Sequence, residues 1–107
     1  MRIDMGIASY NNPNKLDHCI EMIRLNSHSD WRLLVVDNNS PDEGVRLVIE
    51  KHAAQDSRVI PMFLNENIMY PGAVNKILEW AETNNVAYID NDAYIQTPDG
   101  RRLADIP

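Results

Sequence analysis

Two carboxylates separated by one residue are the feature of this sequence that most directly suggests chemistry. Asp90-Asn91-Asp92 follows the apolar run Val86 to Ile89. Two carboxylates at the end of a buried strand repel each other unless a cation lies between them, and hard oxygen ligands suit Mg²⁺ or Mn²⁺ better than zinc. A metal held by carboxylates and phosphate oxygens can stabilise a departing diphosphate as a Lewis acid. The three histidines are scattered without ligand spacing, so they do not suggest a zinc site.

The elements that must position this triplet include four apolar runs rich in β-branched residues. They are Ile3 to Ala8, Leu33 to Val36, Val59 to Leu64 and Val86 to Ile89. The second and fourth runs are short and continuously apolar, which predicts strands buried on both faces of a sheet. Pro61 removes a backbone donor from the third run, which predicts a strand at the edge of the sheet.

Three amphipathic patterns lie between these runs, and each is typical of a helix with one buried stripe. The stripes are Leu16, Cys19, Ile20 and Ile23, then Val45, Val48, Ile49 and His52, then Val74, Ile77, Leu78 and Ala81. Asn12 with Pro13 predicts the start of the first helix. A capping box from Ser40 to Glu43 predicts the start of the second. Asn84-Asn85 predicts the end of the third.

Strands that alternate with helices predict an α/β fold with three layers and a mainly parallel sheet, connected by right-handed crossovers. The chain has 107 residues, the size of one domain. We expect the α/β domain to span residues 1–98 and a polar C-terminal tail to span residues 99–107.

Ligands of such sheets bind outside the carboxyl ends of the strands, so the segments that follow the strands are the candidate site. Those segments are Ser9 to Asn12, Asp37 to Ser40, Asn65 to Asn67 and Asp90 to Asp92, and they hold most of the twelve asparagines. Asn and Asp also form good turns and caps. That explanation fits Asn12 and Ser40 better than it fits a pair of carboxylates.

Composition excludes several partners. A net charge of −6 argues against nucleic-acid binding, which needs a basic patch. No apolar run approaches the roughly 20 residues of a membrane span, and Met1 to Asp4 does not begin a signal peptide. The single cysteine, Cys19, excludes an intrachain disulfide. We therefore expect a cytoplasmic protein with no nucleic-acid partner and no membrane span.

Four ordered motifs resemble the N-terminal half of family-2-type glycosyltransferases with the A-type fold. They are Ile7 to Asn11, Trp31 to Ser40, Asn65 to Asn75 and Tyr88 to Asp92. The order and spacing of the set are far more specific than any one motif. The resemblance implies a truncated, Rossmann-like A-type fold. It also implies an enzyme that binds a UDP-, GDP- or dTDP-sugar with Mn²⁺ or Mg²⁺ and transfers the sugar to an acceptor.

The resemblance assigns roles to the residues at the strand ends. It implies a nucleotide-sugar site of Ala8, Ser9, Tyr10, Asn11, Asp37, Asn38, Gly72, Asn75, Asp90 and Asn91. Tyr10 would stack on the nucleobase, and Asp37 or Asn38 would accept a hydrogen bond from it. Gly72 to Asn75 would line the sugar-diphosphate pocket.

The same resemblance implies that Asp92, with Asp90, ligates the metal, and that Asp90 contacts the ribose or a phosphate. The sequence departs from the family at two places. Asn38 stands where many members have a second aspartate, which leaves the identity of the base less defined. Val74 stands where an arginine is frequent, which removes one positive charge near the diphosphate.

Inverting members that resemble this chain take a general base from a second half, beyond the strand that carries the two aspartates. The sequence continues for fifteen residues after Asp92, and Asp99 and Asp105 are the only carboxylates in that stretch. We expect neither to be the base. We therefore expect a missing C-terminal half to supply the acceptor site, and a homodimer is the alternative partner for the exposed edge.

Other classes stay open. A non-catalytic α/β nucleotide-binding or interaction module is favoured by the short length. A phospho-receiver would need an acidic pair at the end of the first strand, and this chain has none there. A nucleotidyltransferase usually carries a glycine-rich basic loop after the first strand, and Ser9 to Pro13 is neither glycine-rich nor basic.

Overall fold

The computed structural model describes residues 2–26 and 30–89. In this part of the chain the elements are β1 (Ile3–Ser9), α1 (Pro13–Asn26), β2 (Trp31–Asp37), α2 (Glu43–Gln55), β3 (Val59–Phe63), α3 (Met69–Trp80) and β4 (Val86–Ile89). The predicted alternation of strands and helices is therefore confirmed. Asp90, Asn91, Asp92 and the predicted tail lie outside the described residues.

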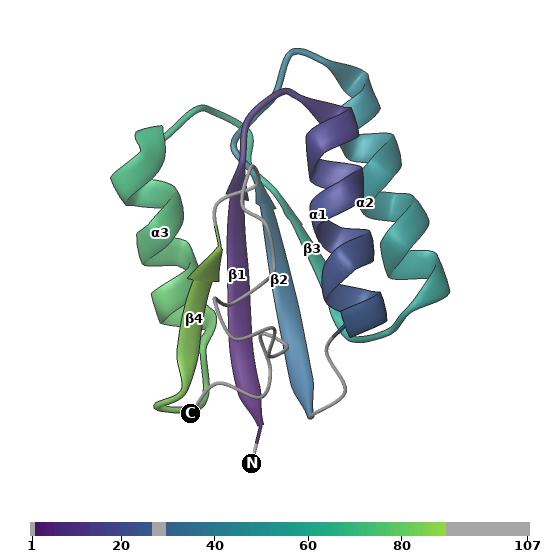
Figure 1. Cartoon of the computed structure of the whole chain (residues 1–107). Coiled ribbons are helices and arrows are strands. Elements are labelled where there is room, and N and C mark those ends of the chain that lie inside the picture. The colour runs from purple at the N-terminus through teal and green to yellow at the C-terminus, as the bar shows by residue number, and fades with distance from the viewer. Residues whose placement is uncertain (1, 27–29, 90–107) are drawn as a thin grey trace.

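The four strands form one parallel sheet in the order β3-β2-β1-β4. Helices α1 and α2 cover one face of the sheet and α3 covers the other, so the fold has the predicted three layers (Figure 1). β3 lies at an edge of this sheet, as Pro61 predicts, because that strand pairs with β2 alone among the described strands.

The two strands predicted to be buried on both faces differ in the structure. β2 lies between β1 and β3, and six of its seven residues are buried. β4 is the other edge of the described sheet, and only Ile89 of its four residues is buried. The prediction is therefore right for β2 and wrong for β4. The cause is position, since within the described residues β4 has a neighbouring strand on one side only.

The face under α1 and α2 holds the larger core. Leu16, Cys19, Ile20 and Ile23 are all buried, so the predicted stripe of α1 is confirmed. In α2, Val45, Ile49 and His52 are buried, whereas Val48 is half-buried. These side chains pack against β1 and β2 and fix both helices on the sheet.

The face under α3 corrects the third predicted stripe. Ala73 and Ile77 are the buried residues of the helix, whereas Leu78 is 56% exposed. The helix is therefore rotated by about one residue from the prediction. Gly6 of β1 permits this packing, because a Cβ at that position would collide with the side chain of Ile77. Trp80, which the sequence places off the stripe, packs against this smaller core.

The predicted helix ends are right at one place and wrong at two. Pro13 is the first residue of α1, as predicted. Asp42, rather than Ser40, caps α2, and its side chain accepts a hydrogen bond from Gly44 N at 2.8 Å. α3 ends at Trp80, four residues before Asn84. The hydroxyl of Ser40 instead accepts a hydrogen bond from Asn11 N, in the loop after β1.

A buried carboxylate fixes the amino-terminal edge of the sheet. Asp4 of β1 is fully buried. It accepts hydrogen bonds from Arg32 Nε at 3.1 Å, from Glu82 N at 2.8 Å and from Thr83 N at 3.1 Å. The α3–β4 connection is therefore tied to β1 and β2 through one side chain. Arg32 also stacks on Trp80, with its guanidinium carbon 4.3 Å from the ring centre.

The ionised form of Asp4 is the one that the fold holds. Burial raises the pKa of a carboxyl group, but the hydrogen bonds from Arg32 and from the two backbone amides outweigh it and lower the pKa of Asp4 below 3.8. A lowered folded-state pKa contributes stability above the ordinary carboxyl pKa. That contribution is lost as the pH falls through the lowered value.

We predict that Asp4→Asn lowers the free energy of unfolding by roughly 2–3 kcal/mol at neutral pH, because the hydrogen bonds to a buried carboxylate are weakened and Arg32 loses the nearer of two carboxylate partners, Asp4 at 3.1 Å and Glu82 at 3.5 Å. Urea unfolding followed by circular dichroism measures the loss. The difference between the variant and the wild type should shrink as the pH falls below 3.8, since protonation removes the same charge from the wild type.

Glu79→Gln is the matched control, because Glu79 is a carboxylate that is 71% exposed and lies 3.9 Å from Lys76. An exposed pair of this kind contributes at most about 1 kcal/mol. Equal losses in the two variants at neutral pH would contradict the assigned role of Asp4.

Candidate functional site

The carboxyl ends of the strands meet at one edge of the sheet. Ser9 at the end of β1 pairs with Asp37 at the end of β2, and Asp37 pairs with Phe63 at the end of β3. The backbone N–H of Asn38 donates to Ser9 O at 2.9 Å and extends the β1–β2 ladder by one residue. The segments that follow the first three strands are therefore neighbours, as the sequence predicts.

Hydrogen bonds from side chains join the first two of these segments. Ser40 Oγ accepts from Asn11 N at 2.9 Å, and Asp37 Oδ1 accepts from Ser40 N at 3.0 Å. Asn11, Asn12 and Asn39 have positive φ angles of 55°, 56° and 59°. Asn is the residue other than glycine that adopts this conformation most readily. These three asparagines therefore allow the backbone to turn, which agrees with the explanation that Asn residues here form turns.

The segment after β3 is joined to β2 by Asn38. Asn38 Oδ1 accepts from Ile68 N at 2.9 Å, and Asn67 Oδ1 accepts from Met69 N at 2.8 Å. Met69 begins α3 with a φ of 64°, which is uncommon for a residue with a long side chain. This turn directs the chain from the sheet edge into α3.

These three segments surround a pocket of about 240 Å³. Its walls are Ala8 and Ser9 at the end of β1, Tyr10 after that strand, Asn38 after β2, Asn67 before α3, and Met69 and Tyr70 at the start of α3. Tyr10 is 45% exposed and Tyr70 is 56% exposed, so both rings offer a face to a ligand. Tyr70 is supported from behind by an edge-on contact with Tyr88, at 5.6 Å between ring centres.

Two polar residues of this pocket are buried. Ser9 and Asn38 are 0% and 6% exposed. The Ser9 hydroxyl has no hydrogen-bond partner within residues 2–26 and 30–89. Buried hydroxyls without a partner are costly, and they occur at places where a ligand or water completes the bond.

A second pocket of about 430 Å³ adjoins the first on the side of α2. Asp37, Asp42 and Glu43 supply its acidic wall, and Ser40, Arg46 and Leu64 line it as well. Arg46 lies flat on Phe63, with its guanidinium carbon 3.8 Å from the ring centre. Asp37 is 6% exposed, and one of its oxygens is already engaged by Ser40 N.

The structure brings together some of the predicted site residues. Ala8, Ser9, Tyr10 and Asn38 line the first pocket, Asp37 lines the second, and Asn11 shapes the turn between them. Gly72 and Asn75 lie on α3 and line neither pocket. Asp90, Asn91 and Asp92 lie outside the described residues, so the structure does not test their predicted roles.

The predicted site residues did not include Met69 and Tyr70, and Asn67 was predicted only as part of the segment after the third strand. An exposed tyrosine beside Pro71-Gly72, at the start of a helix on the carboxyl edge, was the available signal. The positive φ of Met69 was not predictable from its residue type.

Metal ligands are not assembled in the described part of the chain. Residues 2–26 and 30–89 contain no cluster of three or more His, Cys, Asp or Glu side chains that could hold an ion. Asp37 is the buried carboxylate of the carboxyl edge. The pair predicted to bind a metal, Asp90 and Asp92, lies outside the described residues.

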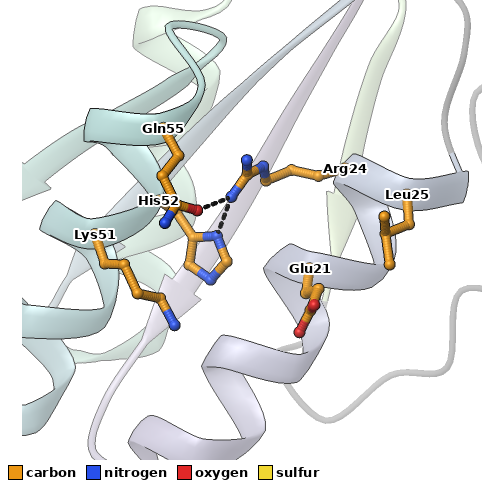
Figure 2. A pocket seen from close by; sticks show the side chains of 6 residues that line it. All are labelled: Glu21, Arg24, Leu25, Lys51, His52 and Gln55. Carbon is orange, nitrogen blue, oxygen red and sulfur yellow. Dashed lines mark hydrogen bonds between the residues drawn. The ribbon is translucent and has the colours of Figure 1, made fainter.

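A third pocket, of about 320 Å³, lies between α1 and α2 (Figure 2). Arg24 of α1 donates to His52 Nδ1 and to Gln55 Oε1 of α2, both at 2.8 Å. The Nε2 of His52 lies 2.6 Å from Asp17 Oδ1, which also accepts from Lys51 at 2.7 Å. Because Arg24 only donates, His52 Nδ1 is the acceptor and its Nε2 carries the proton. These hydrogen bonds link the two helices.

A parallel sheet between two helical layers, with a partly apolar pocket at its carboxyl edge, defines an α/β domain of the Rossmann-like class. The particular family follows from sequence comparison. The chain belongs to glycosyl transferase family 2, whose sequence pattern matches residues 5–105. Among the described residues, no helix is long and apolar enough to cross a bilayer.

Two relatives cover most of the chain. A Bacillus subtilis protein, which its name assigns to teichuronic acid biosynthesis as glycosyltransferase TuaG, is 32% identical over 84 residues. The match covers 78% of this chain and 33% of that protein. The uncharacterized protein y4gI of Sinorhizobium fredii is 34% identical over 91 residues, which are 84% of this chain and 10% of that protein. The chain thus spans a third or less of these relatives.

Solved structures share the fold. The mannosyltransferase PcManGT of Pyrobaculum calidifontis, solved with GDP-Man and Mn²⁺, has a TM-score of 0.78 at 20% identity over 92% of this chain and 29% of its own. Residues 1–349 of S. aureus TarS, solved with UDP, have a TM-score of 0.76 at 23% identity over 89% of this chain and 28% of theirs. The predicted A-type α/β fold is confirmed.

We predict that Ser40→Ala increases amide hydrogen exchange at Asn11 about fivefold, because the loop after β1 loses the acceptor that holds it to β2. Exchange measured residue by residue by NMR tests this. Ser57→Ala, an exposed serine in the turn before β3, is the control and should leave Asn11 unchanged. Unaltered exchange at Asn11 in the Ser40 variant would show that the hydroxyl does not anchor the loop.

Proposed function

We propose that this chain is the donor-binding part of a glycosyltransferase and binds a nucleotide-diphosphate sugar at the carboxyl edge of its sheet. The observation that carries the proposal is the pocket between the ends of β1 and β2 and the start of α3, in a chain of this family. Two exposed tyrosines and a buried serine and asparagine suit a flat, polar-edged nucleobase.

The proposed roles follow the geometry where it is described. Tyr10 stacks on the base, with Ala8 and Ser9 at its side. Asp37, whose Oδ1 is held by Ser40 N, and Asn38 contact the polar edge of the base.

Further roles extend beyond the pocket walls. The ribose and diphosphate extend from the base toward Asn91 and Asp90 and along the stretch from Gly72 to Asn75. That PcManGT was solved with GDP-Man, and TarS with UDP, supports a nucleotide-sugar donor.

The proposed metal is Mn²⁺ or Mg²⁺, held by Asp90 and Asp92. Carboxylate oxygens are the ligands that these hard cations prefer. When bound, the metal would neutralise charge on the departing diphosphate. A neighbour of the same fold was solved with Mn²⁺, which supports the choice. The chain carries a net charge of −6, so a cation is the simplest way to bring a diphosphate to an acidic protein.

Transfer to an acceptor is part of the same proposal. The chain covers 33% of TuaG and 29% of PcManGT. We therefore assign the acceptor site and the general base to a whole enzyme, of which this chain forms the donor-binding part. A homodimer remains the alternative way to cover the exposed edge.

Isothermal titration of the 107-residue chain with UDP, GDP and dTDP, with and without Mn²⁺, tests the proposal. We expect at least one nucleotide to bind with a dissociation constant between about 1 μM and 1 mM, the usual range for enzyme substrates. Mn²⁺ should tighten that binding. Absence of binding by all three nucleotides would overturn the donor-site assignment and favour a non-catalytic module.

We predict that Asp92→Ala removes the tightening by Mn²⁺ and leaves the metal-free affinity unchanged, because one of two carboxylate ligands is lost. The same titration measures both. Asp99→Ala is the matched control, since it removes a nearby carboxylate that is assigned no metal role. A Mn²⁺ effect that persists in the Asp92 variant would exclude Asp92 as a ligand.

A further inference from the structure

The orientation of the Asn38 amide is fixed by its hydrogen bond to the segment after β3. Asn38 Oδ1 lies 2.9 Å from Ile68 N. A backbone N–H can only donate, so the group that faces Ile68 is the oxygen and not the nitrogen. The backbone N–H of Asn38 is held as well, by Ser9 O at 2.9 Å. Both ends of the residue are therefore fixed, and the side chain is 6% exposed.

The Nδ2 of Asn38 is the group left to meet a ligand. Within residues 2–26 and 30–89, the hydrogen bonds of Asn38 are to Ile68 N and Ser9 O, and neither uses Nδ2. Asn38 lines the pocket formed with Tyr10 and Tyr70. The sequence led to the expectation that this amide offers its oxygen to the base, but the structure directs that oxygen to Ile68.

We propose that Asn38 is a specificity-determining residue that donates a hydrogen bond from Nδ2 to the nucleobase. It therefore selects a base edge that presents an acceptor. The carbonyl oxygens of uracil and the ring nitrogen N3 of cytosine are such acceptors, whereas the imide N3–H of uracil is a donor. The inference rests on the proposed binding of a nucleotide at this pocket.

An aspartate at the same position would behave in the opposite way. Its two oxygens have the shape of the Asn38 amide, so one can keep the bond from Ile68 N while the other faces the pocket. A carboxylate there accepts from the N3–H of uracil and repels the lone pair of cytosine N3. Asn38→Asp therefore replaces a hydrogen-bond donor with an acceptor at the pocket and keeps the bond from Ile68 N that holds the loop.

Titration of the wild type and Asn38→Asp with UDP and CDP tests the inference, since these two nucleotides differ only at the base edge. We expect the ratio of UDP to CDP affinity to rise about tenfold in the variant, which corresponds to one hydrogen bond gained or lost. An unchanged ratio, with both nucleotides still bound, would overturn the role of Asn38. If neither nucleotide binds the wild type, the proposed function itself fails.

Asn67→Asp is the matched control. Asn67 lines the same pocket, and its Oδ1 also accepts from a backbone amide, Met69 N at 2.8 Å. The substitution adds the same charge to the same pocket at a different point. An equal rise of the UDP to CDP ratio in this control would show a general effect of charge and overturn the assignment.

The wild type provides a readout that does not depend on the variant folding. In ¹⁵N-resolved NMR spectra, the side-chain NH₂ protons of Asn38 should shift on addition of UDP, because one of them enters a hydrogen bond. Side-chain shifts at Asn38 that stay constant while Tyr10 responds to the nucleotide would exclude the donor role.

Discussion

The carboxyl edge of this sheet depends on side-chain oxygens that accept hydrogen bonds from backbone amides. Where the strands end, the ladder no longer supplies acceptors, and a buried N–H without one is costly. Asp37, Asn38, Ser40 and Asn67 each accept one such bond, from the amides of Ser40, Ile68, Asn11 and Met69. These bonds join three loops from different parts of the sequence into one surface. The pocket exists because the loops are held together in this way.

The opposite edge of the sheet is held by a different means. The buried carboxylate of Asp4 accepts hydrogen bonds from two backbone amides and from Arg32. The arrangement fixes the connection between α3 and β4, far along the sheet from the pocket. Stability and binding are thus assigned to opposite ends of the same strands. The loops of the carboxyl edge can differ in sequence without disturbing the charge that holds the other end.

Much of the fold could be predicted from the sequence, because hydrophobic patterns report burial directly. Leu16, Cys19, Ile20 and Ile23 fall on one face of a helix, so their spacing predicts which face is buried. Pro61 excludes a central position for its strand. The stripe of α3 was mispredicted because its sequence is apolar on more than one side, and only the missing side chain of Gly6 determines which side meets β1. That determinant lies on another element.

Ser40 was mispredicted for the same kind of reason. Ser40 and Glu43 have the spacing of a capping box, and local spacing cannot reveal that Asn11, 29 residues earlier, takes the hydroxyl. The pocket residues Met69 and Tyr70 depend on a turn with positive φ, which nothing in their residue types indicates. Of the predicted site residues, Ala8, Ser9, Tyr10 and Asn38 line one pocket because strand ends place them there, and their binding roles stay predictions.

The choice of asparagine over aspartate at this edge has a physical reason that combines both roles. Either residue can accept a bond from a backbone amide, so either could hold the loops. At position 38 an aspartate would present an acceptor to the proposed base, whereas the amide presents a donor. An amide holds the loop with its oxygen and keeps a neutral donor on its other side. Asn38 therefore holds the loop through Oδ1, and the proposal assigns its Nδ2 to the ligand.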